Sequence, residues 1–125
     1  MIKVKNVFDR VETDDGARLW VEPCGLTTDL REWCEVDHIL CHLGPLPKLA
    51  EWLDDHPEGY EEFRAAYHDG LAKSSFLPLL QQLACAASRE NFTLLHLSED
   101  PCRNIGVALH EFISELQAYC PPDMA

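Results

Sequence analysis

The chain has 125 residues, of which 46% are hydrophobic and 26% charged, and a formal net charge of −12. This length is enough for one domain that buries roughly two-thirds of its unfolded surface without metal or disulfide crosslinks. A surface this negative repels phosphate backbones and acidic lipids, so nucleic acid and membranes are not expected partners.

The N-terminal part of the chain contains two strand-like segments joined by a turn. Residues 2–8 are rich in β-branched side chains and begin with a short alternation of apolar and polar positions, which predicts a first strand. Asp15-Gly16 is typical of a turn, because Asp can accept a hydrogen bond from its own backbone and Gly tolerates a positive φ. Residues 18–21 are expected to form the second strand, which Pro23 and Gly25 would end.

A long helix is predicted for residues 29–43. Asp29 is followed three residues later by Glu32, which resembles a capping box, and Gly44-Pro45 is a stop signal.

The remainder alternates between helical and strand-like segments. A short helix over residues 47–53 precedes one that begins near Pro57, where Tyr60, Phe63 and Tyr67 recur at helical spacing. The segments expected after these are a helix from residue 75, a strand at 92–97 and a last helix at 101–116. Strands separated by long helical segments favour a small three-layer α/β domain, over residues 1–125, with a mostly parallel sheet.

Six cysteines occur, at positions 24, 34, 41, 85, 102 and 120, and none forms a Cys-x-x-Cys pair. The first residues lack the apolar stretch of a signal peptide, and no segment approaches the ~18 apolar residues of a membrane span. We therefore expect a cytoplasmic protein with six reduced thiols, no disulfide and no cofactor.

Three stretches of the chain resemble a bacterial family, domain of unknown function 488, in its short YeaO-like branch. The opening residues 2–9 resemble the family's Ile-Lys-x-Lys-Arg-Val-Tyr-Asp start, and the Asp15-Gly16 turn follows. Residues 52–67 match its Trp-Phe-x-His-Asp-Pro-x-x-Trp-x-x-Phe-x-x-x-Tyr pattern without gaps. The end resembles a Thr-Leu-Leu-Tyr strand, an acidic loop and a helix that carries Asn104.

The chain departs from this family at its most polar signature. Where the family has Asp-Arg-Leu-Trp-Pro-Arg-Gly, this chain has a shorter segment at 21–25, in which only Glu22 and Gly25 have counterparts. Cys41 stands where the family has a lysine. If the family has an anion site built on arginine and lysine, the resemblance implies a divergent member that has lost most of it.

One candidate site is a stripe on the helix predicted at 29–43. Cys34, His38 and Cys41 would lie within roughly 60° of one another on such a helix, which suits a thiophilic metal. Ligands from one short helix rarely complete a tetrahedral site, and cysteines also pack as small hydrophobic side chains. We expect no metal here.

A second candidate is the rim where strands 18–21 and 92–97 end, because ligands gather outside the carboxyl ends of strands in open α/β sheets. A helix that begins near Pro101 would favour an anion and would make Cys102 a reactive thiol. Asp100 is equally consistent with a helix cap. The candidate ligand residues are Arg18, Glu22, Cys24, Asp100, Cys102 and Asn104.

The aromatic residues Trp52, Tyr60 and Tyr67 near His56 are a third candidate. At helical spacing, aromatic side chains are more often core than a stacking platform, and we expect core.

Two functions remain open from the sequence. One is a small-ligand (anion) site at the strand ends, with little or no catalysis. The other is a non-enzymatic interaction module that acts through its acidic surface or an exposed apolar patch. A pocket where the candidate residues converge would favour the first.

Overall fold

A computed structural model describes residues 1–120 and contains one four-stranded parallel sheet. Its strands, in the order β1-β4-β2-β3 across the sheet, are β1 (Ile2–Asn6), β2 (Ala17–Trp20), β3 (His38–Ile39) and β4 (Phe92–His96). β4 is central and fully buried, and Thr93 lies opposite both Lys3 and Arg18 in the register. The predicted α/β class and the three predicted strands are confirmed.

Five α-helices accompany the sheet within residues 1–120. They are α1 (Thr28–Trp33), α2 (Pro47–Asp55), α3 (Tyr60–Ala72), α4 (Leu77–Ala86) and α5 (Ile105–Leu116). Short 3₁₀ turns lie at η1 (Cys41–Leu43), η2 (Pro57–Gly59) and η3 (Gln117–Tyr119). None of the helices in this part of the chain has the length and apolar character to cross a bilayer.

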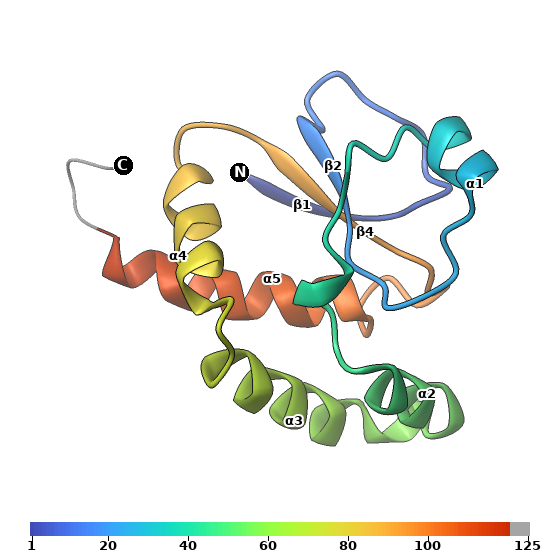
Figure 1. Cartoon of the computed structure of the whole chain (residues 1–125), viewed down its shortest axis with the longest axis vertical. Coiled ribbons are helices and arrows are strands. Elements are labelled where there is room, and N and C mark those ends of the chain that lie inside the picture. The colour runs from blue at the N-terminus through green and yellow to red at the C-terminus, as the bar shows by residue number, and fades with distance from the viewer. Residues whose placement is uncertain (121–125) are drawn as a thin grey trace.

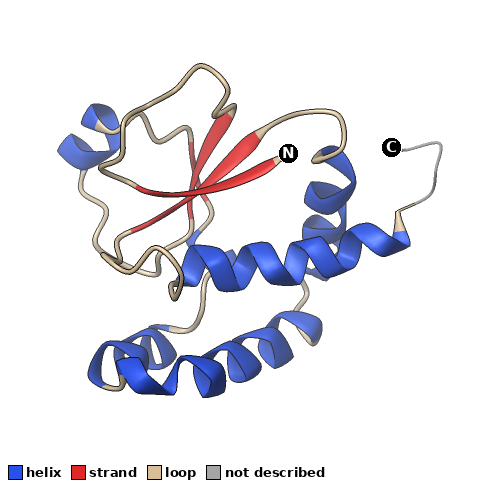
Figure 2. Ribbon diagram, turned by 180° about the vertical axis from the view of Figure 1, so that it is seen from behind, coloured by secondary structure: helices blue, strands red, loops and turns tan. Residues whose placement is uncertain are grey.

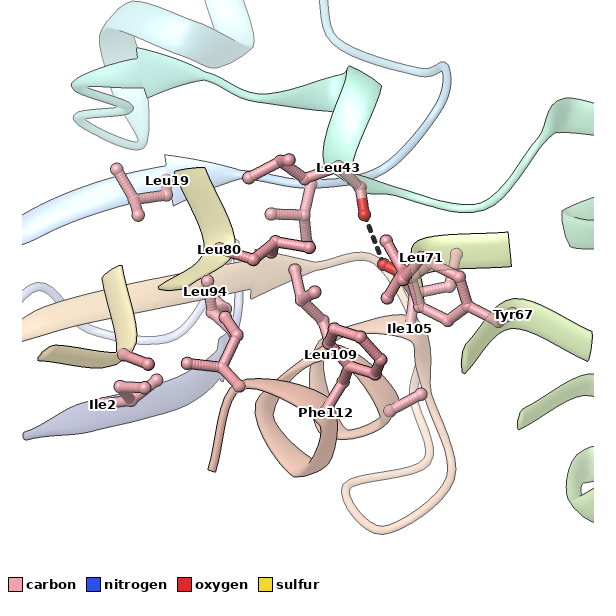
Figure 3. Packing of buried hydrophobic residues seen from close by; sticks show 14 of the residues in the cluster. Ile2, Leu19, Leu43, Tyr67, Leu71, Leu80, Leu94, Ile105, Leu109 and Phe112 are labelled. Carbon is pink, nitrogen blue, oxygen red and sulfur yellow. Dashed lines mark hydrogen bonds between the residues drawn. The ribbon is translucent and has the colours of Figure 1, made fainter. Parts of the chain in front are cut away.

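The helices cover the two faces of the sheet unequally. α4 and α5 lie against one face, α3 packs on the outer side of α5, and α1 lies on the other side of the sheet (Figures 1 and 2). The main core fills the space between β2, β4 and the α3–α5 helices (Figure 3). Within it, the Tyr67 hydroxyl donates a hydrogen bond to the Leu43 carbonyl at 2.6 Å.

The opposite face carries a smaller apolar cluster beside a group of charges. The cluster consists of Val7, Trp20, Cys34, Val36 and Leu95. The loop between β1 and β2 crosses this face, where Asp15 is bound by Lys3, Lys5 and Arg18. Gly16 allows the crossing because its φ is +63°, and a Cβ there would overlap the Asn91 carbonyl oxygen.

The helix predicted over residues 29–43 is wrong. The cap is Thr27, whose hydroxyl accepts from the Leu30 N–H, and the helix ends after six residues, at Trp33. Glu35 takes a left-handed conformation with φ 52°, and the N–H groups of Glu35 and Val36 bond back to the carbonyls of Glu32 and Arg31. These two bonds form a Schellman motif, in which glycine usually occupies the left-handed position. Because Glu stands there instead, no local pattern indicates that the helix ends here. The residues that follow form β3 alongside β2.

A disulfide bond joins Cys85 of α4 to Cys120 just beyond η3, so the prediction of six reduced thiols is wrong. The Cα atoms of the two residues are 5.6 Å apart, although 35 positions separate them in sequence. Packing of α4 on α5 brings them together, which no local spacing could show. Cys24, Cys34, Cys41 and Cys102 are free thiols.

Candidate functional site

A pocket of about 490 Å³ opens at the carboxyl edge of the sheet, beyond the ends of β2 and β4. Its walls come from three places: the segment after β2, helix α2, and the loop between β4 and α5. The lining residues are Glu22, Pro23, Cys24, Gly25, Pro47, Ala50, Glu51, Leu53, Asp54, Pro57, Leu97, Ser98, Glu99, Asp100, Arg103, Asn104 and Ile105. Four of the six predicted ligand residues are among them, namely Glu22, Cys24, Asp100 and Asn104.

Glu22 joins the two strand ends. Its Oε1 accepts a hydrogen bond from the Leu97 backbone N–H at 3.0 Å, so one carboxylate oxygen ties the segment after β2 to the segment after β4. Burial raises the pKa of Glu22, the Leu97 N–H lowers it, and the negative charge of Asp54 raises it further. Oε2 has no hydrogen-bond partner among residues 1–120.

Asp100 and Asn104 organise the loop that leads into α5. The Asp100 Oδ1 accepts from the N–H groups of Cys102 and Arg103 at 2.9 and 3.1 Å. Asn104, only 1% exposed, caps the helix: its Oδ1 accepts from the Val107 N–H and its Nδ2 donates to the Asp100 carbonyl, both at 2.8 Å. Both side chains are therefore committed to holding the backbone in place.

The predicted start of the last helix at Pro101 is wrong by four residues, because α5 begins at Ile105 behind the Asn104 cap. Cys102 consequently lies in an exposed loop and not on the first helical turn. It is also absent from the pocket lining.

Arg18 lies away from the pocket. Its guanidinium points to the face of the sheet that the β1–β2 loop crosses, where Nη1 donates to Asp15 and Nε and Nη2 donate to the Cys34 carbonyl. With Arg18 elsewhere and the α5 N-terminus capped by its own Asn104, five carboxylates face the pocket against one arginine, Arg103. This charge balance gives the predicted anion site no support.

Helix α2 provides a pocket wall that was not expected from the sequence. Pro47, Ala50, Glu51 and Asp54 line the cavity and repeat at the three- and four-residue spacing of a single helical face. That spacing was visible in the sequence. What it could not show was that this face lies over the ends of β2 and β4.

The other two predicted constellations contribute no site. Cys34, His38 and Cys41 do not share a helix: they lie at the end of α1, in β3 and in η1, and Cys34 is buried whereas the other two are exposed. Tyr60 and Tyr67 are buried in the core, as predicted. Burial and the Glu111 charge raise the pKa of Tyr60 to about 12, with Arg64 opposing, so its hydroxyl stays protonated at neutral pH.

A second concavity, of about 440 Å³, lies on the α1 side of the sheet. It is lined by Val7, Phe8, Asp9, Arg10, Val11, Leu30, Trp33 and Cys34. Two of its aromatic side chains are unusually open to solvent, since Phe8 is 69% and Trp33 86% exposed. This groove is the apolar patch on which an interaction role would depend.

Comparison with known proteins identifies one family. A family model named DUF488-N3i and described as the inactive DUF488-N3 subclade matches residues 1–120. No curated protein and no solved structure matches the chain. The match agrees with the resemblance seen in the sequence at the level of the DUF488 family and does not bear on the YeaO-like branch.

Proposed function

Because the chain belongs to the inactive DUF488-N3 subclade, we propose that it binds a small ligand in the pocket at the carboxyl edge of the sheet without converting it. The observation that carries this proposal is the pocket itself, which forms where two parallel strands end and α2 closes the side. In α/β folds, ligands bind at the carboxyl ends of the strands in enzymes and in non-catalytic proteins alike.

The lining supports binding better than catalysis. Its side chains include no histidine or lysine, and Cys24 and Ser98 are the only thiol and hydroxyl among them. Neither is hydrogen-bonded to a lining carboxylate within residues 1–120, and Ser98 Oγ instead accepts from the Asp100 N–H at 3.1 Å. A nucleophile needs a base within hydrogen-bond reach, and the pocket offers no such pair.

Filling the pocket tests this function. Ala50 lies on the α2 wall and also packs against the edge of the core, so Ala50→Phe should exclude a ligand, and its thermal midpoint shows whether the core is kept. Native mass spectrometry after incubation with a small-molecule extract should show an added mass on the wild-type chain and on Ala65→Phe, an exposed position on α3, but not on Ala50→Phe. The ligand should be recovered unchanged. An added mass that Ala50→Phe retains, or a ligand recovered as a product, contradicts the proposal.

A second candidate function is an interaction module, and the exposed Phe8 and Trp33 favour it. Aromatic side chains open to solvent in a groove are typical of protein-binding surfaces, where tryptophan often supplies much of the binding energy. Trp33→Ser should then abolish co-purification of a partner without changing the thermal midpoint. If Trp33→Ser instead unfolds the chain, this role is contradicted.

A further inference from the structure

The carboxylates of the sheet-edge pocket come from three separate segments of the chain. Glu22 follows β2, Glu51 and Asp54 lie on α2, and Glu99 and Asp100 precede α5. Like charges brought together by folding repel one another, and this is visible in the contribution of Asp54 to the raised pKa of Glu22. A positive group entering the pocket would relieve that repulsion.

Arg103 is the one cationic side chain among the lining residues, against five carboxylates. Several acids outside the pocket are paired: Asp15 with Lys3, Lys5 and Arg18, Glu111 with Arg64, and Asp69 with Lys73. Among residues 1–120, no ion pair within 4.0 Å involves any of the five pocket carboxylates. Half-buried Glu22 has an oxygen left over for a ligand after its bond to Leu97.

The spacing of the carboxylates selects an organic cation over a metal ion. Divalent ions need several oxygen ligands converging at close range. The only described group of three or more possible ligands within 4.8 Å is Glu12, Asp14 and Asp15, in the β1–β2 loop, where lysine and arginine already neutralise it. The pocket carboxylates lie farther apart than those of this group. Such spacing fits separate contacts to the charged end of a larger molecule.

Most of the other lining residues are apolar, with Ser98, Arg103 and Asn104 as the polar exceptions. Leu53, Leu97 and Ile105 line the cavity together with three prolines, Pro23, Pro47 and Pro57. A cavity of about 490 Å³ is large enough for a ring or a branched chain of drug-like size. The ligand that fits both features has an apolar body and one positively charged end.

We propose that the pocket binds an organic cation, an amine or amidine attached to an apolar body, with its charge beside Glu22 and Asp54. This inference rests on the proposed binding function and names the class of ligand. The apolar body would lie against Leu97 and Ile105, and the ammonium group would donate to the free oxygen of Glu22.

Three probes of matched shape test the class of ligand. Benzylamine, benzyl alcohol and benzoate carry the same ring and differ in charge. In titrations followed by amide NMR, benzylamine should shift the signals of Gly25, Leu97 and Ser98 saturably, with a dissociation constant at least tenfold lower than that of benzyl alcohol. Benzoate should be the weakest. Glu22→Gln keeps an oxygen that can accept from Leu97 and should weaken benzylamine several-fold while leaving benzyl alcohol unchanged.

The exposed Glu115 on α5 supplies the matched control, because Glu115→Gln removes the same charge far from the pocket and should leave benzylamine binding intact. If benzyl alcohol or benzoate binds the same residues as tightly as benzylamine, the cation class is wrong and the pocket remains a binding site. If all three probes perturb only residues outside the pocket, the proposed function fails as well. Equal weakening by Glu22→Gln and Glu115→Gln would also overturn the inference, because it would reflect overall charge.

Discussion

Arg18 Nη1 lies 2.7 Å from Asp15 Oδ2, and the two residues are only 2% and 1% exposed. Asp15 also accepts from Lys3 and Lys5 at 3.1 Å, and its carbonyl accepts from the Thr93 hydroxyl at 2.8 Å. Asp15 therefore connects the β1–β2 loop to β1 and β2 through its buried carboxylate and to β4 through its backbone carbonyl. Arg18 extends the network to the end of α1 through the Cys34 carbonyl.

Removing the charge of Asp15 should be strongly destabilising. Asp15→Asn leaves the Arg18 guanidinium buried without its counter-ion, and breaking one partner of a buried pair costs about 3–5 kcal/mol of unfolding free energy. Urea denaturation followed by tryptophan fluorescence measures this loss. Asp14→Asn, which removes an exposed partner of Lys3, is the control and should barely move the midpoint. Equal effects of the two variants would show that burial of the pair is unimportant.

Acid should weaken the fold through the same carboxylate. Burial raises the pKa of Asp15, but the Glu12 N–H and the side chains of Lys3, Lys5 and Arg18 lower it to about 2, from the ordinary 3.8. Because the folded pKa is the lower one, the unfolded chain binds the proton first as pH falls. Stability on the order of 2 kcal/mol is then present above pH 5 and is lost between about pH 5 and pH 2. The stability difference between wild type and Asp15→Asn should shrink over that range, and a constant difference contradicts the assignment.

His96 should make stability depend on pH in a higher range. Burial lowers its pKa, with Asp9 opposing, and its Nδ1 accepts from the Ser98 N–H at 3.1 Å. Below about pH 6.5, His96 therefore binds a proton more readily in the unfolded chain than in the folded one. The free energy of unfolding then falls with decreasing pH by no more than about 1.4 kcal/mol per pH unit. Stability should fall from pH 7 to pH 5. His96→Asn, which keeps an acceptor near Nδ1, should fall less steeply; an unchanged slope would assign the effect to another group, such as His110.

Reduction should destabilise the C-terminal end of the fold. The Cys85–Cys120 bond closes a loop of 35 residues, for which the expected contribution is about 2–4 kcal/mol. Thiol titration of the unreduced, denatured chain should find four free groups, and Cys85→Ser should lower the urea midpoint as reductant does. Cys102→Ser, at an exposed free thiol, is the control. Six free thiols in protein purified under air would show that the bond does not form.

The parts of the fold that the sequence predicted are those with local signals. Alternation and β-branched residues predicted β1, and the helical spacing of Tyr60, Phe63 and Tyr67 after Pro57 predicted α3. The prediction for the segment after Trp33 was wrong because Glu35 takes the left-handed conformation just beyond the helix end, where glycine is the usual signal. β3 has only two residues and is held by Leu19 and Trp20 of β2, so its pairing depends on tertiary contacts that no local pattern carries.

The pocket was predictable in position but not in charge. The rule that ligands gather at strand ends located Glu22, Cys24 and the loop before α5. The sequence could not show that Arg18 would turn toward Asp15, or that α2 would add Glu51 and Asp54 to the wall. Both outcomes follow from packing across the sheet, and together they replace an expected anion site with an acidic pocket.

The last prediction separates the two roles that Asn104 could have. As a cap, Asn104 accepts from the Val107 N–H and donates one amide hydrogen to the Asp100 carbonyl, so Asn104→Ala should cost about 1–2 kcal/mol of unfolding free energy. Asn104→Ser restores an oxygen that can accept from the Val107 N–H and should recover most of that loss. If Asn104 acts only as a cap, Asn104→Ser should bind benzylamine as wild type does. A variant that regains stability but loses the probe would return Asn104 to the ligand role expected from the sequence.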